Sequence, residues 1–475
     1  MTAKQTGLIV GALGLAITAL TAPPAGMSAQ AWIVAGLVVI MAAWWITEAV
    51  PLAVTALLPF LVLPLAGVMD AKKTASAYYS DIIFLLLGGA FLALAIERTG
   101  LHRRLAIFLL STLARGGGQF RLLLAFMAAA AILSMAISNT STALIMMPVA
   151  LAVLAGGEHP APDDPDWMKR GMLGALPMGI AFAASIGGLG TLVGSPTNAI
   201  AVGLIDEILG VRISFAEWTA FGLPIVLVGV PLAAWLIARV QRIADHPFDV
   251  AAARAAVESH DVWTTPERRL VPIIAITFLL WMTQALLEPF LPDGALTEGT
   301  VAVAAALALF LIPDGTGRPL LQWDEADRAP WGVLLMFGGG LALAAGMSAS
   351  GFADWVGQQL LPLEVLPLIV IAAVAVALVI VVTEFASNVA TASGIMPVIA
   401  ALTVGLGADP LLLAMPAALA ASWGFILPAG TGPNAIAWST GRLRIEKLVS
   451  AGLALDIVGI FLIVGAVWAV AGISG

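Results

Sequence analysis

Two stretches of this chain, SNTSTALIMMPVA at residues 138–150 and SNVATASGIMPVI at residues 387–399, share 7 of 13 residues. Each begins with a Ser-Asn pair inside a long apolar segment, and the two pairs are 249 positions apart. Polar side chains are expensive within a bilayer and usually have a function there. A membrane protein that repeats such a motif in both halves is expected to build one ligand site from two repeats.

Two further pairs of motifs indicate an internal duplication of roughly 200 residues. Gly-Gly pairs at 88–89 and 338–339 precede the Ser-Asn motifs, and the segments GSPTNAIA at 194–201 and GTGPNAIA at 430–437 follow them. The three landmarks keep the same order in both halves. The last pair also predicts breaks in two long helices, because glycine and proline interrupt helical hydrogen bonding.

Composition defines the class of protein. Hydrophobic residues make up 61% of the chain, charged residues only 11%, and the mean hydropathy is +1.03, which exceeds what a soluble core could bury. The long apolar runs lack the alternation of a β-barrel and predict a polytopic helical membrane protein. There is no cysteine for disulfides or thiolate metal sites, no basic run for nucleic acid and no phosphate-binding loop for ATP. Uphill transport would therefore use an ion gradient or exchange.

Charge distribution predicts the topology. We expect the two Ser-Asn stretches, 120–155 and 367–404, to be re-entrant hairpins and the N-terminus to be cytoplasmic. Of the 21 Lys and Arg residues, 18 then face the cytoplasm, as the positive-inside rule requires. The C-terminus lies outside, and the two halves are inverted with respect to each other. The eleven remaining apolar spans are 7–22, 31–47, 51–66, 82–98, 172–204, 219–240, 270–288, 298–312, 331–350, 411–440 and 451–473.

The N-terminal span after Lys4 is also compatible with a cleavable signal peptide, but we expect a retained helix.

The chemistry of the paired motifs suits two kinds of ligand. Ser, Asn and Thr oxygens, together with carbonyls of unwound backbone, suit a weakly held cation such as Na⁺. Amide and hydroxyl donors at the N-termini of half-helices suit a carboxylate. The alternative is that these residues only cap kinks or allow close helix packing, but four motifs paired by a repeat favour a ligand site. Glu384 is either a proton carrier or a residue that orients a helix. We expect no catalytic residues, since no Ser-His-acid arrangement lies at matched depth.

The chain resembles the divalent anion:sodium symporter family, the INDY-like dicarboxylate transporters. The resemblance covers nearly the whole chain and depends on the segment WITEAVPLAVT at 45–55, both Ser-Asn motifs and both Asn-Ala-Ile helix breaks. It implies a homodimer in the cell inner (plasma) membrane, in which each protomer has a scaffold domain and a transport domain that moves as an elevator. The chain departs from the sequence patterns of some family members at Val389 and Gly432. At Val389, a hydroxyl group that would bind the substrate is missing.

The resemblance also implies the site residues. One Na⁺ site is expected to use Ser134, Ser138, Asn139 and Gly194, and the other Thr383, Ala386, Asn388 and Gly430. The dicarboxylate is expected between them, in contact with Asn139, Thr140, Ser195, Pro196, Asn388, Val389 and Thr431.

The expected organisation follows from the repeat, the topology and the resemblance. A first transmembrane helix occupies 1–30, and a cytoplasmic linker at 241–269 separates the repeats. The first repeat, 31–240, comprises scaffold helices 31–115, the hairpin 120–155, a broken helix 172–204 and a helix 219–240. The inverted second repeat, 270–475, comprises scaffold helices 270–350, the hairpin 367–404, a broken helix 411–440 and a helix 451–473.

The leading function is import of a C4-dicarboxylate such as succinate, malate or fumarate with Na⁺ as the coupling ion. The nearest alternative is a Na⁺-independent dicarboxylate exchanger on the same fold. An anion channel or an intramembrane hydrolase is a more distant alternative. The expected partners are the substrate, the lipid bilayer and a second copy of the chain, with no nucleic acid.

Overall fold

The computed structural model describes residues 2–113, 117–158, 169–255, 262–360, 362 and 365–474. Over these ranges the chain is helical, and an isolated bridge between Pro313 and Pro319 is the one β feature. This confirms the all-α fold expected from composition. Arg115, at the end of the expected scaffold region, and residues 256–261 of the expected linker lie outside the described residues.

The first half of the chain contains thirteen of the α-helices within the described ranges. They are α1 (Ala3–Leu20), α2 (Ala29–Thr47), α3 (Leu52–Thr55), α4 (Leu58–Leu65), α5 (Ala71–Ala77), α6 (Ile82–Thr99), α7 (Leu101–Leu113), α8 (Gln119–Ser134), α9 (Asn139–Gly157), α10 (Met172–Gly187), α11 (Pro196–Leu209), α12 (Phe215–Gln241) and α13 (Val250–Ala255).

The second half follows a similar order. Its helices are α14 (Thr265–Leu287), α15 (Glu298–Leu311), α16 (Trp323–Ala326), α17 (Trp331–Ser350), α18 (Phe352–Leu360), α19 (Leu368–Phe385), α20 (Asn388–Gly405), α21 (Pro410–Ala420), α22 (Gly432–Ser439) and α23 (Ile445–Ser474). Helices α6, α8 and α9 begin 249 positions before α17, α19 and α20, which is the spacing of the Ser-Asn motifs.

Eleven helices in the described ranges are long and apolar enough to cross a membrane. The number agrees with the sequence prediction, but the members differ. The set includes α9, α19 and α20, which the sequence assigned to hairpins, and omits 51–66, 298–312 and 411–440. The first of these omitted spans is divided into α3 and α4, the second is only 14 residues long as α15, and the third is interrupted between α21 and α22.

The two helix breaks are held by a repeated asparagine. Between α10 and α11 the chain forms two short 3-10 turns, η2 (Gly188–Gly190) and η3 (Leu192–Gly194). Asn198 Nδ2 donates to the carbonyls of Gly188 and Thr191, at 2.7 and 2.8 Å. In the second half Asn434 Nδ2 donates to the Leu427 carbonyl at 3.1 Å. The Asn of each Asn-Ala-Ile motif therefore donates hydrogen bonds to carbonyls of its own helix break.

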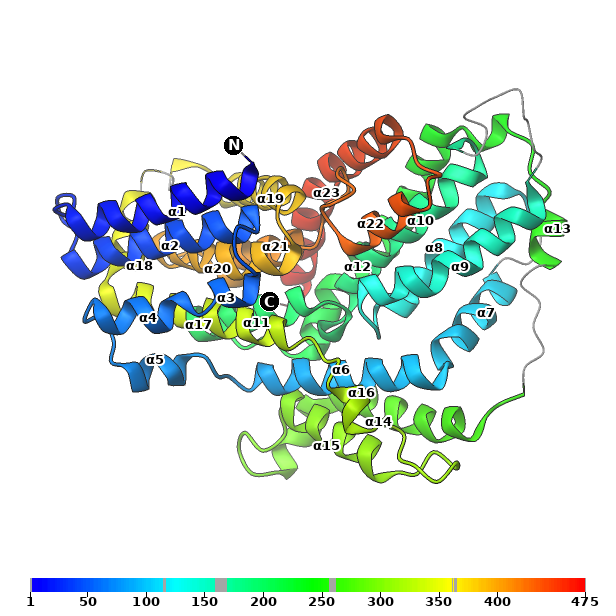
Figure 1. Ribbon diagram of the computed structural model, residues 1–475, viewed down its shortest axis with the longest axis horizontal. Coiled ribbons are helices and arrows are strands. Elements are labelled where there is room, and N and C mark those ends of the chain that lie inside the picture. Colours follow the sequence, from blue (N-terminus) through cyan, green and yellow to red (C-terminus); the bar gives the residue numbers. More distant parts are fainter. Residues whose placement is uncertain are drawn as a thin grey trace.

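Helix α10 lies at the centre of the half that contains the first Ser-Asn motif. All its residues are buried, as expected for a helix that is apolar on every side. In Figure 1, α8 and α9 lie with α10 at one end of the molecule, while α1 and α2 lie side by side at the other. Helices α14 and α15 pack along α6 at the lower edge of the same view.

Candidate functional site

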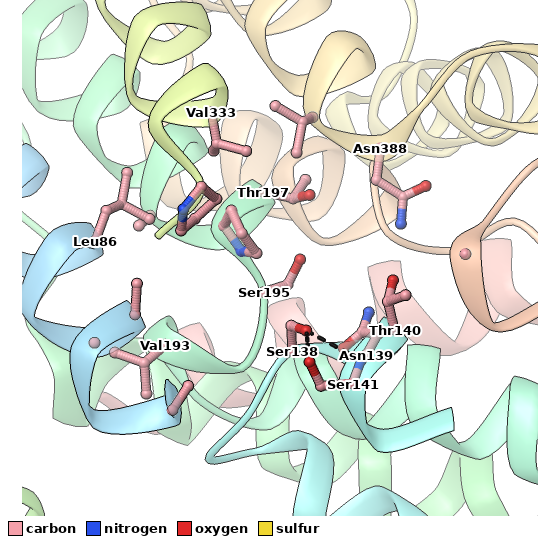
Figure 2. A pocket seen from close by; sticks show the side chains of 18 of the residues that line it. Leu86, Ser138, Asn139, Thr140, Ser141, Val193, Ser195, Thr197, Val333 and Asn388 are labelled. Carbon is pink, nitrogen blue, oxygen red and sulfur yellow. Dashed lines mark hydrogen bonds between the residues drawn. The ribbon is translucent and has the colours of Figure 1, made fainter. Parts of the chain in front are cut away.

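A cavity of about 610 Å³ lies where the two halves meet. Segments of both Ser-Asn motifs and of both helix breaks contribute to its wall. Figure 2 shows Ser138, Asn139, Thr140 and Ser141 on one side of the pocket, with Ser195 and Asn388 close by. From the motifs and the helix breaks, the lining residues with a polar side chain or no side chain are Ser138, Asn139, Thr140, Ser141, Ser195, Thr197, Ser387, Asn388, Gly430, Thr431 and Gly432.

Four of the helices that begin at this cavity have a hydroxyl side chain at their N-cap. Their N-cap residues are Ser138 for α9, Ser195 for α11, Ser387 for α20 and Thr431 for α22, and all four line the wall. Ser138, Ser387 and Thr431 each accept a hydrogen bond from a backbone N–H in the first turn of their own helix. Helix N-termini offer N–H groups and the positive end of the helix dipole, so the cavity suits an anion.

A group of oxygen atoms lies next to Asn139 of the first motif, in the protein interior. Ser134 is fully buried at the end of α8, and its Oγ donates to the Ala184 carbonyl at 2.7 Å. The inward end of the Asn139 amide lies 2.7 Å from Ser134 Oγ, 3.1 Å from Ala184 O and 3.2 Å from Gly194 O. With its nitrogen inward, Asn139 donates to these oxygens. With its oxygen inward, four oxygens converge, which is the environment that a hard monovalent cation requires.

The second motif repeats this arrangement. Thr383 is fully buried near the end of α19, and its Oγ1 donates to Asn388 Oδ1 at 3.0 Å and to the Ala421 carbonyl at 2.8 Å. The hydroxyl of Thr383 has one proton, so its hydrogen bonds to these two acceptors share that proton. The second group matches the first in residue type and in contacts: Thr383, Asn388 and Ala421 correspond to Ser134, Asn139 and Ala184.

Glycine is required where these elements meet. A Cβ at Gly194 would lie 2.5 Å from the Gly188 carbonyl oxygen and 2.9 Å from the Ser134 carbonyl oxygen. A Cβ at Gly432 would lie 2.3 Å from Thr140 Oγ1, so α22 and α9 approach closely across the two halves. Only a hydrogen atom fits at these positions without displacing a neighbour.

The cavity brings the expected substrate residues together: Asn139, Thr140, Ser195, Pro196, Asn388, Val389 and Thr431 all line its wall. The expected cation residues divide into two groups. Ser138, Asn139, Asn388 and Gly430 also line the cavity, whereas Ser134, Gly194, Thr383 and Ala386 are buried outside its lining.

Sequence reasoning missed several residues. Ser387 lies where Ser138 lies in the other repeat, so the repeat itself would have identified it. Ser141 and Thr197 also lie within the motifs, but the second half has Ala390 and Pro433 at the matching positions, so the repeat gives no such signal for them. Ala184 and Ala421 contribute carbonyl oxygens, which any residue can supply, so their side chains carry no information about this role.

The lining has little formal charge. Glu97 and the exposed Arg328 are its charged members among the described residues, and neither belongs to the Ser-Asn motifs or the helix breaks. No group of three or more His, Cys, Asp or Glu side chains in the described ranges is arranged to hold a metal ion. Neutral oxygens and helix N-termini therefore dominate the chemistry of the site.

Comparison with known proteins shows similarity over nearly the full chain. Residues 2–473 match the family described as the sodium:sulfate symporter transmembrane region. The sodium-dependent dicarboxylate transporter SdcS of Staphylococcus saprophyticus is 38% identical over 471 residues, covering 97% of this chain and 90% of that protein. SdcS of Staphylococcus aureus strain MRSA252 is 37% identical over 475 residues, covering 98% of this chain and 90% of that protein.

A solved structure has a similar fold. The YdaH transporter of Alcanivorax borkumensis, described as having an unusual topology, aligns with 100% of this chain and 99% of its own. The TM-score is 0.57 and the sequence identity is 15%, so this likeness concerns the fold alone.

Proposed function

Because this chain belongs to the sodium:sulfate symporter family, we propose that it is a secondary active transporter that imports C4-dicarboxylates with Na⁺. The names of its relatives support both the ion and the substrate class, since each is called a sodium-dependent dicarboxylate transporter. The observation that carries the proposal is the cavity at which four helix N-termini meet beside two matched groups of oxygens. The protein is a multi-pass membrane transporter and not an enzyme.

In this proposal each repeat supplies one Na⁺ site. Ser134, Ser138, Asn139 and Gly194 form the first, and Thr383, Ala386, Asn388 and Gly430 form the second. Asn139 supports the first assignment, because its amide can turn its oxygen toward a cation that the neighbouring carbonyls also face. Bound Na⁺ would fix both helix tips at the cavity wall.

The dicarboxylate lies between the two cation sites. Its carboxylates accept hydrogen bonds from hydroxyl groups and from the N-termini of α9, α11, α20 and α22. Among the described residues, the exposed Arg328 is the one basic side chain that lines the cavity, so the negative charge of the substrate is balanced by Na⁺ and by helix ends. Succinate, malate and fumarate are the candidate C4-dicarboxylates for this site.

The proposal also includes the movement of the transport domain, the assembly of two copies and their orientation in the membrane. The two Ser-Asn stretches act as re-entrant hairpins in a transport domain that moves as an elevator against a scaffold. Two copies form a homodimer in the plasma membrane, with each N-terminus cytoplasmic and each C-terminus outside. The shared spacing of α6, α8 and α9 with α17, α19 and α20 supports the underlying repeat.

Uptake of labelled succinate into proteoliposomes, with and without an inward Na⁺ gradient, tests the proposal. We expect uptake that requires external Na⁺. A companion titration of succinate binding to purified protein at several Na⁺ concentrations, with choline holding ionic strength constant, measures the coupling. Linkage requires Na⁺ to tighten succinate binding, and succinate to tighten Na⁺ binding, by the same factor of roughly 5 to 150. Equal succinate affinity with and without Na⁺, together with succinate counterflow in Na⁺-free buffer, would identify an exchanger.

A further inference from the structure

A second cavity, of about 680 Å³, is lined mainly by α7 and by the first half of α14. The end of α6 and the end of α8, with the turn that follows it, complete the wall. In Figure 1, α7 slants away from the end of α6, and α14 runs along the lower edge of the view. None of the described residues that line this cavity lines the cavity of the candidate site. We call it the α7–α14 cavity.

The wall of the α7–α14 cavity is largely apolar. Leu101, Leu105 and Phe108 follow one another at helical spacing on α7, so they share one face of that helix. Val271 and Ala275 do the same on α14, a helix that is long and apolar enough to span a membrane. Phe108 is 62% exposed and Val271 is 38% exposed. Because exposed apolar side chains of a membrane-spanning helix face lipid, this part of the cavity opens toward the hydrocarbon of the bilayer.

The opposite end of the cavity carries charge. Arg103 and Arg104 lie in the first turn of α7, and Glu267 lies in the first turn of α14. Arg104 Nε donates to Glu267 Oε1 at 2.9 Å, and the Arg104 guanidinium lies 4.7 Å from the centre of the Trp263 ring. Trp263 also lines the cavity and is 45% exposed. Tryptophan is enriched where a membrane meets water, so this end of the cavity lies at a membrane surface.

Arg103 provides the charge that its neighbours leave unbalanced. Its side chain is exposed and forms no ion pair with another residue in the described ranges. Glu267 does not supply that pair, because its Oε1 is bonded to Arg104 and its Oε2 accepts hydrogen bonds from the N–H and the hydroxyl of Thr264. Two arginines and one glutamate therefore leave one positive charge in the described lining, beside His102, whose Nδ1 lies 2.9 Å from a backbone carbonyl oxygen.

The charged and apolar parts of the cavity follow one another along the helices. On α14 the lining extends from Glu267 to Ala275, which is about 12 Å at 1.5 Å per residue. An occupant that fits both parts has an anionic group at the membrane surface and hydrocarbon within the bilayer. A phospholipid has its groups in this order.

We propose that the α7–α14 cavity binds one anionic phospholipid of the bilayer, with its phosphate at Arg103 and an acyl chain along the apolar faces of α7 and α14. A phosphodiester carries one negative charge, which matches the charge that Arg103 leaves unbalanced. Basic pockets between transmembrane helices bind anionic head groups by this match. A free phosphate ion would leave the apolar faces uncovered, and a choline head group would bring a second positive charge to Arg103. The inference depends on the membrane-spanning fold and is independent of Na⁺ coupling.

Titration of the purified full chain with phosphatidylglycerol, or with phosphatidylcholine of the same acyl chains, tests the head group. Native mass spectrometry measures the affinity of the first lipid bound per chain. One basic side chain favours an anionic lipid about fivefold, so we expect the wild type to prefer phosphatidylglycerol by about that factor. Arg103→Gln should abolish the preference. Arg268→Gln is the matched control and should keep it, because Arg268 is exposed in the first turn of α14 but is not part of the lining.

A second pair of variants tests the acyl chain. Ala275→Trp places a large side chain in the apolar part of the cavity and should exclude about two methylene groups of the lipid, so phosphatidylglycerol should bind about fifteenfold more weakly. Ile276→Trp is the matched control, since Ile276 is 57% exposed on the same helix and lies outside the lining. It should bind phosphatidylglycerol as tightly as the wild type does. Size-exclusion chromatography and thermal unfolding in detergent establish that the variants are folded.

Equal affinity of the wild type for the two lipids would overturn the inference, and so would an unchanged preference in Arg103→Gln. Equal losses in Arg103→Gln and Arg268→Gln would show a general attraction of anionic lipid to the basic surface and would contradict a defined site. Equal effects of Ala275→Trp and Ile276→Trp would place the acyl chain elsewhere. Full displacement of phosphatidylglycerol by inorganic phosphate would identify a site for a small anion and would overturn the acyl-chain contact.

Discussion

Replacement of Asn139 by alanine tests the first cation site most directly. The Asn139 amide contacts Ser134 Oγ, Ala184 O and Gly194 O within 3.2 Å, and the residue is 9% exposed. In Asn139→Ala the Ser134 hydroxyl still donates to Ala184, but the Gly194 carbonyl loses its side-chain partner. A buried polar group left unpaired costs about 1–3 kcal/mol, and each ~1.4 kcal/mol changes an affinity tenfold.

Because a bound cation also loses the Asn139 amide oxygen, we expect Asn139→Ala to raise the half-saturating Na⁺ concentration for succinate uptake about fivefold to 150-fold. Asn388→Ala is the matched comparison in the other repeat. Asn388 is only half-buried, and its side chain has one hydrogen bond, from Thr383 at 3.0 Å. Loss of one neutral hydrogen bond costs about 1 kcal/mol, so its effect should be nearer fivefold.

The assay is Na⁺-dependent succinate uptake by proteoliposomes that contain equal amounts of each variant. Size-exclusion chromatography and thermal unfolding in detergent establish that the variants are folded. Wild-type Na⁺ dependence in Asn139→Ala would refute the assignment of the first site. A larger effect in Asn388→Ala than in Asn139→Ala would refute the reasoning from burial and contacts.

Three further changes test other parts of the structure. Val389→Thr adds a hydroxyl at the cavity wall and should change the relative affinity for succinate and its hydroxylated analogues about fivefold, as measured by competition. Unchanged selectivity would place Val389 away from the ligand. Gly432→Ala should weaken succinate binding by displacing Thr140, and Thr140→Ala combined with it should show no additional loss if the displacement is the cause. Asp314→Asn removes the buried carboxylate that pairs with Arg98. Arg98 keeps Glu325 and the carbonyls of Pro319 and Leu320 as partners, so the protein should lose about 1.5–3 kcal/mol in thermal unfolding, the usual value of a hydrogen bond to a charged group. Burial alone would raise the pKa of Asp314, but hydrogen bonds led by Arg98 hold it well below its usual range. That stabilisation is present above the unfolded pKa of about 4, so unfolding measured at pH 7 and at pH 5 should show the same Asp314 contribution.

The sequence was most informative where polar side chains occur in apolar surroundings. Ser138, Asn139 and Asn388 could be identified because a membrane segment has few other reasons to contain them. The repeat then linked positions distant in the chain, and all seven substrate residues that the family resemblance implied line one cavity. The roles of Ala184 and Ala421 could not be predicted, because a backbone carbonyl is independent of side-chain identity.

Tertiary contacts explain the main difference in helix boundaries. Residues 51–66 are apolar except for Thr55 and were expected to form one span, but the structure divides them into α3 and α4 at Ala56 and Leu57. The Ala56 carbonyl accepts a hydrogen bond from Tyr78 Oη at 2.7 Å, and a Cβ at Gly339 would lie 2.5 Å from the same oxygen. A carbonyl turned out of the helix toward distant residues gives no signal in local hydropathy.

The nearly neutral lining of the cavity has a consequence for the electrical behaviour of the transport cycle. A binding site with a fixed arginine at its centre would carry that charge across the membrane even when empty, and the membrane potential would act on the return step, at about 2.3 kcal/mol per charge per 100 mV. In the proposed elevator cycle, the positive charge would arrive with the Na⁺ ions and leave with them. The empty site would then return across the membrane almost independently of the membrane potential. A site that holds the dianion without Na⁺ would carry an unbalanced negative charge and would be the least favourable species to move. In that proposed cycle, the composition of the site would itself discourage uncoupled leakage of substrate, without a separate gate.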